Sequence, residues 1–302
     1  MDTQHYGADI VKPDMSQFQP IADCRNPRQY ERKRSKPMFG SDVTYESNDW
    51  YNQRSILGAY CGVIDTAIPG KLQHGWQWGT GVDDEGRERI RHTSIKTWVW
   101  NGRNKEKAQS VGLDVEAIGA AVLYLEDEKD FVPGLGVLAV PYHSQPPYQI
   151  HKWDDWSREA YFLAGDFKRK TVLLYYRDYQ EAKPHFENYG FTVCCLGGPY
   201  AEDFLPRLRR LIRAHELVIG DRISTTAFYA NVWGRPFMLH GEPLVTELTD
   251  PFEGPGADRE FAKREFPHFV SGKVDSARAD YELGRENMRK PGELRNMFGW
   301  RS

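Results

Sequence analysis

The sequence predicts an α/β fold with two domains, each built on a parallel sheet. Short apolar runs, such as residues 171–176 (TVLLYY) and 191–196 (FTVCCL), are separated by helical patterns such as residues 202–214. Strands that alternate with helices through short connections are typical of parallel sheets. The chain has 302 residues, which is long enough for two domains of ordinary size, each with its own core.

The first predicted domain covers residues 46–135 and follows a polar leader, residues 1–45, that carries a basic patch and either contacts the body or stays solvated. The patterns predict, in order, a helix at 47–64, a strand ending at Leu72, a charged loop at 83–91, a strand at 95–100, a helix from Asn101 to Gly112 and a strand at 115–119. This order indicates a Rossmann-like sheet. The G-x-G-x-x-G fingerprint is missing, so neither NAD nor FAD is expected.

The second predicted domain covers residues 136–302 and follows a linker at residues 126–136 that contains Pro133 and two glycines. Its pattern predicts strands at 137–140, 171–176, 191–196, 217–219 and 237–239, and helices at 181–189, 202–214 and from Ser224 to Gly234. These elements predict a second doubly wound sheet. The charged tail ends in apolar residues between Leu294 and Trp300, which predict a terminal helix that packs back on the body.

Composition narrows the class of protein. Hydrophobic residues make up 40% and charged residues 27%, and the net charge is −3, so a broad basic face for nucleic acid is not expected. The sequence contains neither a signal-peptide pattern nor an apolar run of membrane-spanning length, which predicts a cytoplasmic protein. The four cysteines (Cys24, Cys61, Cys194 and Cys195) lack metal-ligand spacing and are interpreted as reduced, packed thiols.

The segment from Val218 to Leu239 carries the clearest chemical signal. A short apolar strand is followed by Arg222 and by three hydroxyl residues, Ser224, Thr225 and Thr226, that open a helix. A helix N-terminus presents unpaired N–H groups and partial positive charge, so these hydroxyls and the Arg222 guanidinium could hold a phosphate or diphosphate. The alternative is that Ser224 is only an N-cap, a common role for serine.

A second signal is His74-Gly75, in the turn that follows the strand ending at Leu72. The carboxyl edge of an open α/β sheet is where ligands bind, and a histidine has a pKa suited to taking a proton from a hydroxyl group. The alternative is a surface or packing histidine.

Four further residues follow predicted strands. His143 and Ser144 follow the strand at 137–140 and could bind phosphate or polarise a leaving group, although His143 could equally cap or pack. Arg177 follows the strand at 171–176 and could bind a phosphate in fork geometry or form a salt bridge. Glu242 follows the last strand and could hold a sugar or ribose hydroxyl.

Together these motifs resemble the two-domain transferases that build bacterial capsules and teichoic acids, a group of GT-B type that includes the CDP-glycerol glycerophosphotransferases. The resemblance is carried by His74-Gly75, by Ser224-Thr225-Thr226 and by Gly234-Arg235-Pro236, with a polar turn at residues 101–104 that includes Arg103. It covers residues 60–240. It implies two Rossmann-like domains that face a cleft, with acceptor or sugar contacts at Gly75, Trp76, Gln77, Arg103 and Glu242.

The resemblance also implies a reaction. A nucleotide-sugar or CDP-polyol donor would lie on the second domain, and the hydroxyl group of a glycan or other acceptor would lose its proton to His74 while attacking the donor. The sequence contains no Asp-x-Asp triplet, so no metal or other cofactor is expected. The enzyme would act in the cytoplasm or at the inner face of the membrane. A nucleotide-sugar epimerase or hydrolase, or a non-catalytic binding subunit, remains an alternative.

Overall fold

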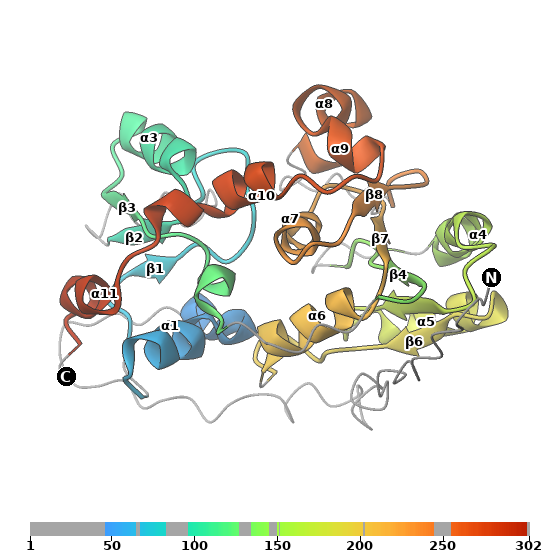
Figure 1. Cartoon of the computed structure of the whole chain (residues 1–302), viewed down its shortest axis with the longest axis horizontal. Coiled ribbons are helices and arrows are strands. Elements are labelled where there is room, and N and C mark those ends of the chain that lie inside the picture. Colours follow the sequence, from blue (N-terminus) through green and yellow to red (C-terminus); the bar gives the residue numbers. More distant parts are fainter. Residues whose placement is uncertain are drawn as a thin grey trace, which may run out of the picture.

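The computed structural model describes residues 46–64, 67–82, 96–126, 134–144, 150, 152–201, 203–244 and 255–300. Three predicted features lie outside these residues: the leader (1–45), the charged loop (83–91) and residues 127–133 of the linker. The described residues form two lobes, each around a parallel sheet, which confirms the predicted α/β class (Figure 1).

The second lobe contains a sheet of five parallel strands in the order β6-β5-β4-β7-β8. Its strands are β4 (Val137–Ala139), β5 (Lys170–Leu173), β6 (Thr192–Cys194), β7 (Leu217–Gly220) and β8 (Phe237–Leu239). The chain starts at the central strand, proceeds outward to β6, and then crosses to β7 and β8. The strand order therefore reverses between β4 and β7, the place where doubly wound sheets bind ligands.

Helices flank this sheet, as the alternating pattern predicts. They are α4 (Trp153–Leu163), α5 (Tyr179–Asn188), α6 (Phe204–Arg213), α7 (Thr225–Val232), α8 (Arg259–Glu265) and α9 (Pro267–Val270), with a 3-10 turn, η5, at Pro255–Ala257. The sequence analysis assigned no element to α4. Its signal is the spacing of Trp153, Trp156 and Ala160, which form one buried face at helical intervals.

The first lobe contains a smaller parallel sheet in the order β1-β2-β3. Its elements are β1 (Lys71–Leu72), β2 (Thr97–Val99), α3 (Gly102–Ser110), β3 (Val115–Ala117) and the helix α1 (Gln53–Cys61). Asn101 caps α3 as predicted, since its Oδ1 accepts a bond of 2.9 Å from the Asn104 N–H.

The predicted helix at 47–64 is broken in two. A 3-10 segment, η3 (Glu46–Asn52), precedes α1, and Tyr51 and Asn52 adopt left-handed backbone with φ of 58° and 66°. Contacts with the second lobe hold this break: the Tyr51 N–H donates to the Pro199 carbonyl at 2.6 Å, and Asn52 Oδ1 accepts from the Phe204 N–H. The break is a tertiary effect that a helical pattern cannot reveal.

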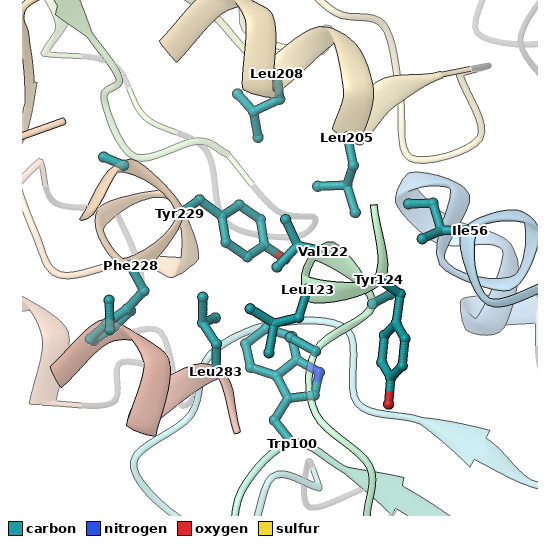
Figure 2. Packing of buried hydrophobic residues seen from close by; sticks show 14 of the residues in the cluster. Ile56, Trp100, Val122, Leu123, Tyr124, Leu205, Leu208, Phe228, Tyr229 and Leu283 are labelled. Atoms are coloured by element: carbon teal, nitrogen blue, oxygen red, sulfur yellow. The ribbon is translucent and has the colours of Figure 1, made fainter. Parts of the chain in front are cut away.

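One continuous apolar cluster joins the lobes. It includes Trp98 and Trp100 of the first lobe together with Leu138 and Val218 of the second. Between them lies a short 3-10 segment, η4 (Ala121–Tyr124), whose buried side chains point toward both lobes (Figure 2). The lobes therefore share a core.

The C-terminal segment packs back on the body, as the sequence predicts for the terminal helix, and it does so on the first lobe. Its elements are α10 (Ser276–Leu283), a 3-10 turn η6 (Arg285–Asn287) and α11 (Pro291–Phe298). The Trp98 and Phe298 rings pack with centroids 5.1 Å apart, and Trp300 Nε1 donates to the Ala67 carbonyl at 2.6 Å. Gly284 has φ of 76°, and a Cβ there would lie 1.8 Å from the Trp100 carbonyl oxygen. The sequence-based boundary assigned residues 136–302 to one domain, whereas these contacts attach the last part to the first lobe.

His215 provides a pH test of this fold. It is fully buried; its Nδ1 donates to the Leu211 carbonyl and its Nε2 lies 2.8 Å from Thr171 Oγ1. Burial lowers its pKa to about 4, below the ordinary value near 6.5. The unfolded chain therefore binds a proton first on acidification, and stability present above about pH 6.5 is lost toward pH 4. We expect His215→Gln to reduce the stability difference between about pH 7 and pH 4.5 by about 2–3 kcal/mol in urea denaturation.

The matched control is His185→Gln on α5, because the His185 side chain is 36% exposed. A second control, Thr192→Val at an exposed position of β6, removes no titratable group and should keep the wild-type pH dependence. An unchanged pH dependence in the His215 variant would contradict the assignment.

Candidate functional site

The two motifs predicted to face each other are in direct contact. The Trp76 N–H, just after His74-Gly75, donates to Thr225 Oγ1 at the start of α7, with a distance of 2.8 Å. A Cβ on Gly75 would lie 3.4 Å from the same oxygen. The contact joins positions 149 residues apart and brings the carboxyl edge of β1 to the carboxyl edge of β7.

Gln73 shapes the turn that carries His74. Its Nε2 donates to the Gly75 carbonyl at 2.9 Å, and its Oε1 accepts from the Trp100 N–H at 3.0 Å. The Trp100 indole N–H also donates to the Gln73 carbonyl at 3.0 Å. The side chain is buried, so these bonds fix the turn against the neighbouring strand β2.

His74 itself is partly buried. Its ring meets the Trp50 ring edge-on, with centroids 4.7 Å apart and an interplanar angle of 80°. Trp50 belongs to the broken segment η3, so the same break that contacts the second lobe also orients the histidine.

The N-terminus of α7 differs from an ordinary cap. Ser224 occupies the N-cap position with extended backbone, yet its side chain makes no capping bond. Ser224, Thr225 and Thr226 are all partly exposed. The Thr225 oxygen accepts from Trp76, and its hydroxyl proton can still be donated.

Arg222 is held inside the second lobe. It is 7% exposed, its Nε donates to Asp221 Oδ2 at 3.1 Å, and its Nη2 donates to the Leu244 carbonyl. Its guanidinium lies over the Tyr142 ring, 3.7 Å from the centroid. The guanidinium thus lies at the strand reversal between β4 and β7, but Asp221 balances its charge, so the predicted phosphate-binding arginine is engaged within the second lobe.

His143 and Ser144 lie at the same edge of the sheet. The Ser144 N–H donates to Asp178 Oδ2 at 2.9 Å, and Ser144 Oγ accepts from the Ile150 N–H at 3.0 Å. The His143 ring packs on Tyr175 with centroids 4.3 Å apart. Burial lowers the pKa of His143, so its imidazole is neutral at neutral pH and supplies a hydrogen-bonding group without a charge.

The remaining predicted residues divide into two groups. Arg177 and Glu242 are exposed: Arg177 Nε donates to the Tyr176 hydroxyl at 2.8 Å, and the Glu242 N–H donates to Glu159 Oε2 at 2.9 Å. The Gln77 carbonyl accepts from Asn104 Nδ2 at 3.1 Å.

Trp76 and Arg103 both bind the buried carboxylate of Glu282 on α10. Trp76 Nε1 donates to Glu282 Oε2 at 2.9 Å, and Arg103 forms a bidentate pair at 2.7 and 2.6 Å. These two predicted sugar contacts are therefore engaged with the C-terminal segment.

Sequence reasoning missed two buried carboxylates in this region, although it selected their arginine neighbours. Asp178 follows β5 and accepts from Ser144, while Asp221 follows β7 and accepts from the Tyr142 N–H at 2.7 Å and the Leu244 N–H at 3.0 Å. Each therefore ties the loop after β4 to a neighbouring strand. The available signal was the position of Asp221 immediately after β7 and of Asp178 in the loop that follows β5.

A cluster of tyrosines between the lobes was also missed. Burial, together with nearby Tyr176, raises the pKa of Tyr51 to about 12. Burial likewise raises the pKa of Tyr175 and of Tyr229, and Tyr51 adds to both shifts. These phenols stay protonated at neutral pH, and Tyr175 is hydrogen-bonded to Tyr176. The residues come from three distant segments, which leaves no local sequence signal.

The residues that the structure describes contain no group of three or more His, Cys, Asp or Glu side chains placed to hold a metal ion. Among their helices, none combines the length and the apolar character needed to cross a bilayer.

The sequence matches no protein-family model and no curated protein. Three solved structures show a distant likeness: S. aureus MnaA with UDP (10% identity, 85% of this chain and 78% of that chain, TM-score 0.39), a UDP-GlcNAc 2-epimerase from Neisseria meningitidis bound to UDP-GlcNAc (10%, 78% and 79%, 0.38), and a S. aureus TarM mutant in complex with Fondaparinux, alpha-GlcNAc-glycerol and UDP (10%, 76% and 48%, 0.37). The chain spans about half the length of TarM. Identities near 10% and TM-scores below 0.4 are too low to support any statement about ligand or reaction.

Proposed function

We propose that this protein transfers a sugar or a polyol phosphate from a nucleotide-activated donor to a hydroxyl group of a glycan or other acceptor. One observation carries the proposal: the Trp76 N–H to Thr225 Oγ1 bond of 2.8 Å joins the His74 turn to the N-terminus of α7. The sequence resemblance, independently of the fold, assigns a base to the first motif and donor phosphate to the second.

In this proposal the donor phosphates lie at the α7 N-terminus, where partial positive charge and hydroxyl donors favour an anion. Ser224, Thr225 and Thr226 provide those hydroxyls, and Arg222, whose charge is balanced by Asp221, lies two residues before Ser224. His74 accepts the proton of the attacking hydroxyl group as the new bond to the donor carbon or phosphorus forms and the bond to the departing phosphate breaks. The phosphate charge that develops is stabilised by groups already in place.

Two substitutions test the proposed donor-phosphate site at the N-terminus of α7. Ser224→Ala should change the free energy of unfolding by about 0.5 kcal/mol or less, because the Ser224 side chain makes no capping bond. Thr225→Val should cost about 1–3 kcal/mol, since the Trp76 N–H loses its acceptor. Each should weaken donor binding by about 10–100-fold, because a bond to a charged phosphate contributes about 1.5–3 kcal/mol.

The measurement is thermal stability and calorimetric titration with CDP-, UDP-, GDP- and CMP-activated donors. A donor at about 100 times its Kd should stabilise the wild type by about 2.7 kcal/mol. Thr192→Val, at an exposed position of β6, is the control and should bind donor normally. Equal donor affinity in the Ser224 variant and the wild type would remove α7 from the site.

Activity assays distinguish the alternatives. Transfer to an acceptor supports the proposal. Conversion of the donor without any acceptor identifies an epimerase or hydrolase, and donor binding without conversion identifies a binding subunit. Capsule or teichoic-acid synthesis at the inner face of the membrane is the setting that the resemblance suggests for the transferase.

A further inference from the structure

A cavity of about 260 Å³ lies between the lobes, away from His74 and Thr225. Its lining combines apolar side chains with three arginines and comes from η4, from the ends of α6 and α7, and from η6: Val122, Leu123, Leu125, Arg209, Arg213, Val232, Trp233 and Arg285. The η4 side chains that form part of its floor are visible in Figure 2. We propose that this cavity is a binding site for a small phosphate monoester attached to a planar or apolar group.

The arginine side chains of the cavity indicate the phosphate part of this ligand. Arg209 and Arg213 are four residues apart on α6, so their side chains share one face of the helix. Arg285 approaches from η6, beside the first lobe. None of the cavity-lining residues in the described part of the chain carries a carboxylate. Guanidinium groups match phosphate oxygens in both charge and fork geometry.

Their neighbours hold two of the arginines in place. Arg209 is 6% exposed, and its Nη1 donates to the Glu126 carbonyl at 2.7 Å. Arg285 is exposed, and its Nε donates to Asp280 Oδ1 at 2.6 Å. The cavity thus has a fixed guanidinium inside, while the guanidinium at its solvent side is paired with Asp280 and keeps further N–H donors for an anion that enters from solvent.

The apolar lining of the cavity indicates the planar or apolar part of the ligand. Trp233 offers a ring for stacking, and Val122, Leu123 and Val232 offer aliphatic surface. A volume of about 260 Å³ is smaller than the ~300–1,000 Å³ of typical ligand sites, so the occupant is a compact molecule. Inorganic phosphate would leave the apolar wall uncovered, whereas an aryl or similar phosphate would cover both parts.

The cavity is lined by residues of both lobes. Val232 and Trp233 belong to the second lobe, Arg285 lies beside the first, and η4 crosses between them. An occupant that contacts all three should restrain their relative motion. The cavity contains none of the residues of the proposed donor-phosphate site, so this inference does not depend on the proposed transferase function.

The test is calorimetric titration of the full chain with phenyl phosphate, inorganic phosphate and phenol. Phenyl phosphate should bind more tightly than either of the other probes. Arg213→Gln should weaken its binding at least tenfold, while Arg210→Gln, which removes an exposed charge from the same helix outside the cavity, should leave it unchanged. Ser224→Ala should bind phenyl phosphate normally, because the Ser224 side chain makes no capping bond and is not part of the cavity lining, and this separates the cavity from the proposed donor-phosphate site at the N-terminus of α7.

A second variant separates the two halves of the ligand without altering charge. Val232→Phe fills the apolar part, so it should abolish the advantage of phenyl phosphate over inorganic phosphate. Hydrogen exchange of the amides in η4 should slow in the wild type when phenyl phosphate is present.

Three outcomes would overturn the site. They are equal binding by the Arg213 and Arg210 variants, no preference for phenyl phosphate over phenol, and a loss of stability in Arg213→Gln with no effect on binding. The last result would mean that the arginines only offset the partial negative charge at the C-termini of α6 and α7.

Discussion

Replacing His74 with alanine should lower the rate of transfer by about 10²–10⁴-fold and leave the donor dissociation constant unchanged. The proposed role of His74 is to accept the proton of the attacking hydroxyl group, a step that occurs only in the transition state. Loss of such an interaction lowers kcat without weakening the ground-state complex. His74 lies on the turn that is joined to Thr225, so it is beside the proposed donor-phosphate site and not part of it.

The measurement combines steady-state kinetics with calorimetric donor titration. His185→Ala is the control, since this histidine lies on α5 and its side chain is 36% exposed. A His74→Ala enzyme that retains wild-type kcat would eliminate the proposed base. A variant that loses donor binding as well would reassign His74 to the binding of the donor.

Replacing Glu282 with glutamine should destabilise the protein by about 3–5 kcal/mol, the largest stability effect that we expect from a single polar substitution here. The Glu282 carboxylate is 0% exposed. It pairs with Arg103 at 2.6 Å and Arg278 at 3.1 Å and accepts from Trp76 Nε1 at 2.9 Å. Without its charge, the Arg103 guanidinium, 13% exposed, and the Arg278 guanidinium, 31% exposed, both lose the Glu282 counter-ion.

The same substitution should also reduce activity, because Trp76 connects Glu282 to the His74 turn through its indole and to Thr225 through its backbone. Urea denaturation measures the stability change, and Glu286→Gln, at an exposed position three residues after α10 ends, is the control with an expected change within about 0.5 kcal/mol. A double-mutant cycle with Trp76→Phe should be non-additive. Additive effects would show that the two side chains act independently.

Much of the fold follows from local pattern. The runs that become β4, β5 and β7 are apolar because an inner parallel strand is covered on both faces, and the alternation of strands with helices leaves few other topologies. Asn101 marks a helix start, and Gly234, with φ of 75°, marks a helix end, because both roles depend on the residue itself. The break at Tyr51 and Asn52 was not predictable, since it depends on contacts with Pro199 and Phe204.

The candidate site divides in the same way. The sequence by itself determined that a histidine turn and a hydroxyl-rich helix start would each follow a strand, because strand ends and helix starts carry local signals. Only the tertiary structure decided which charged side chains are buried and paired beside the histidine turn and the helix start. Arg177 lies exposed while its neighbour Asp178 is buried, and Glu282, distant in sequence, anchors both Trp76 and Arg103. Burial and pairing of charges depend on which segments meet in space, and that information is present in no single stretch of the chain.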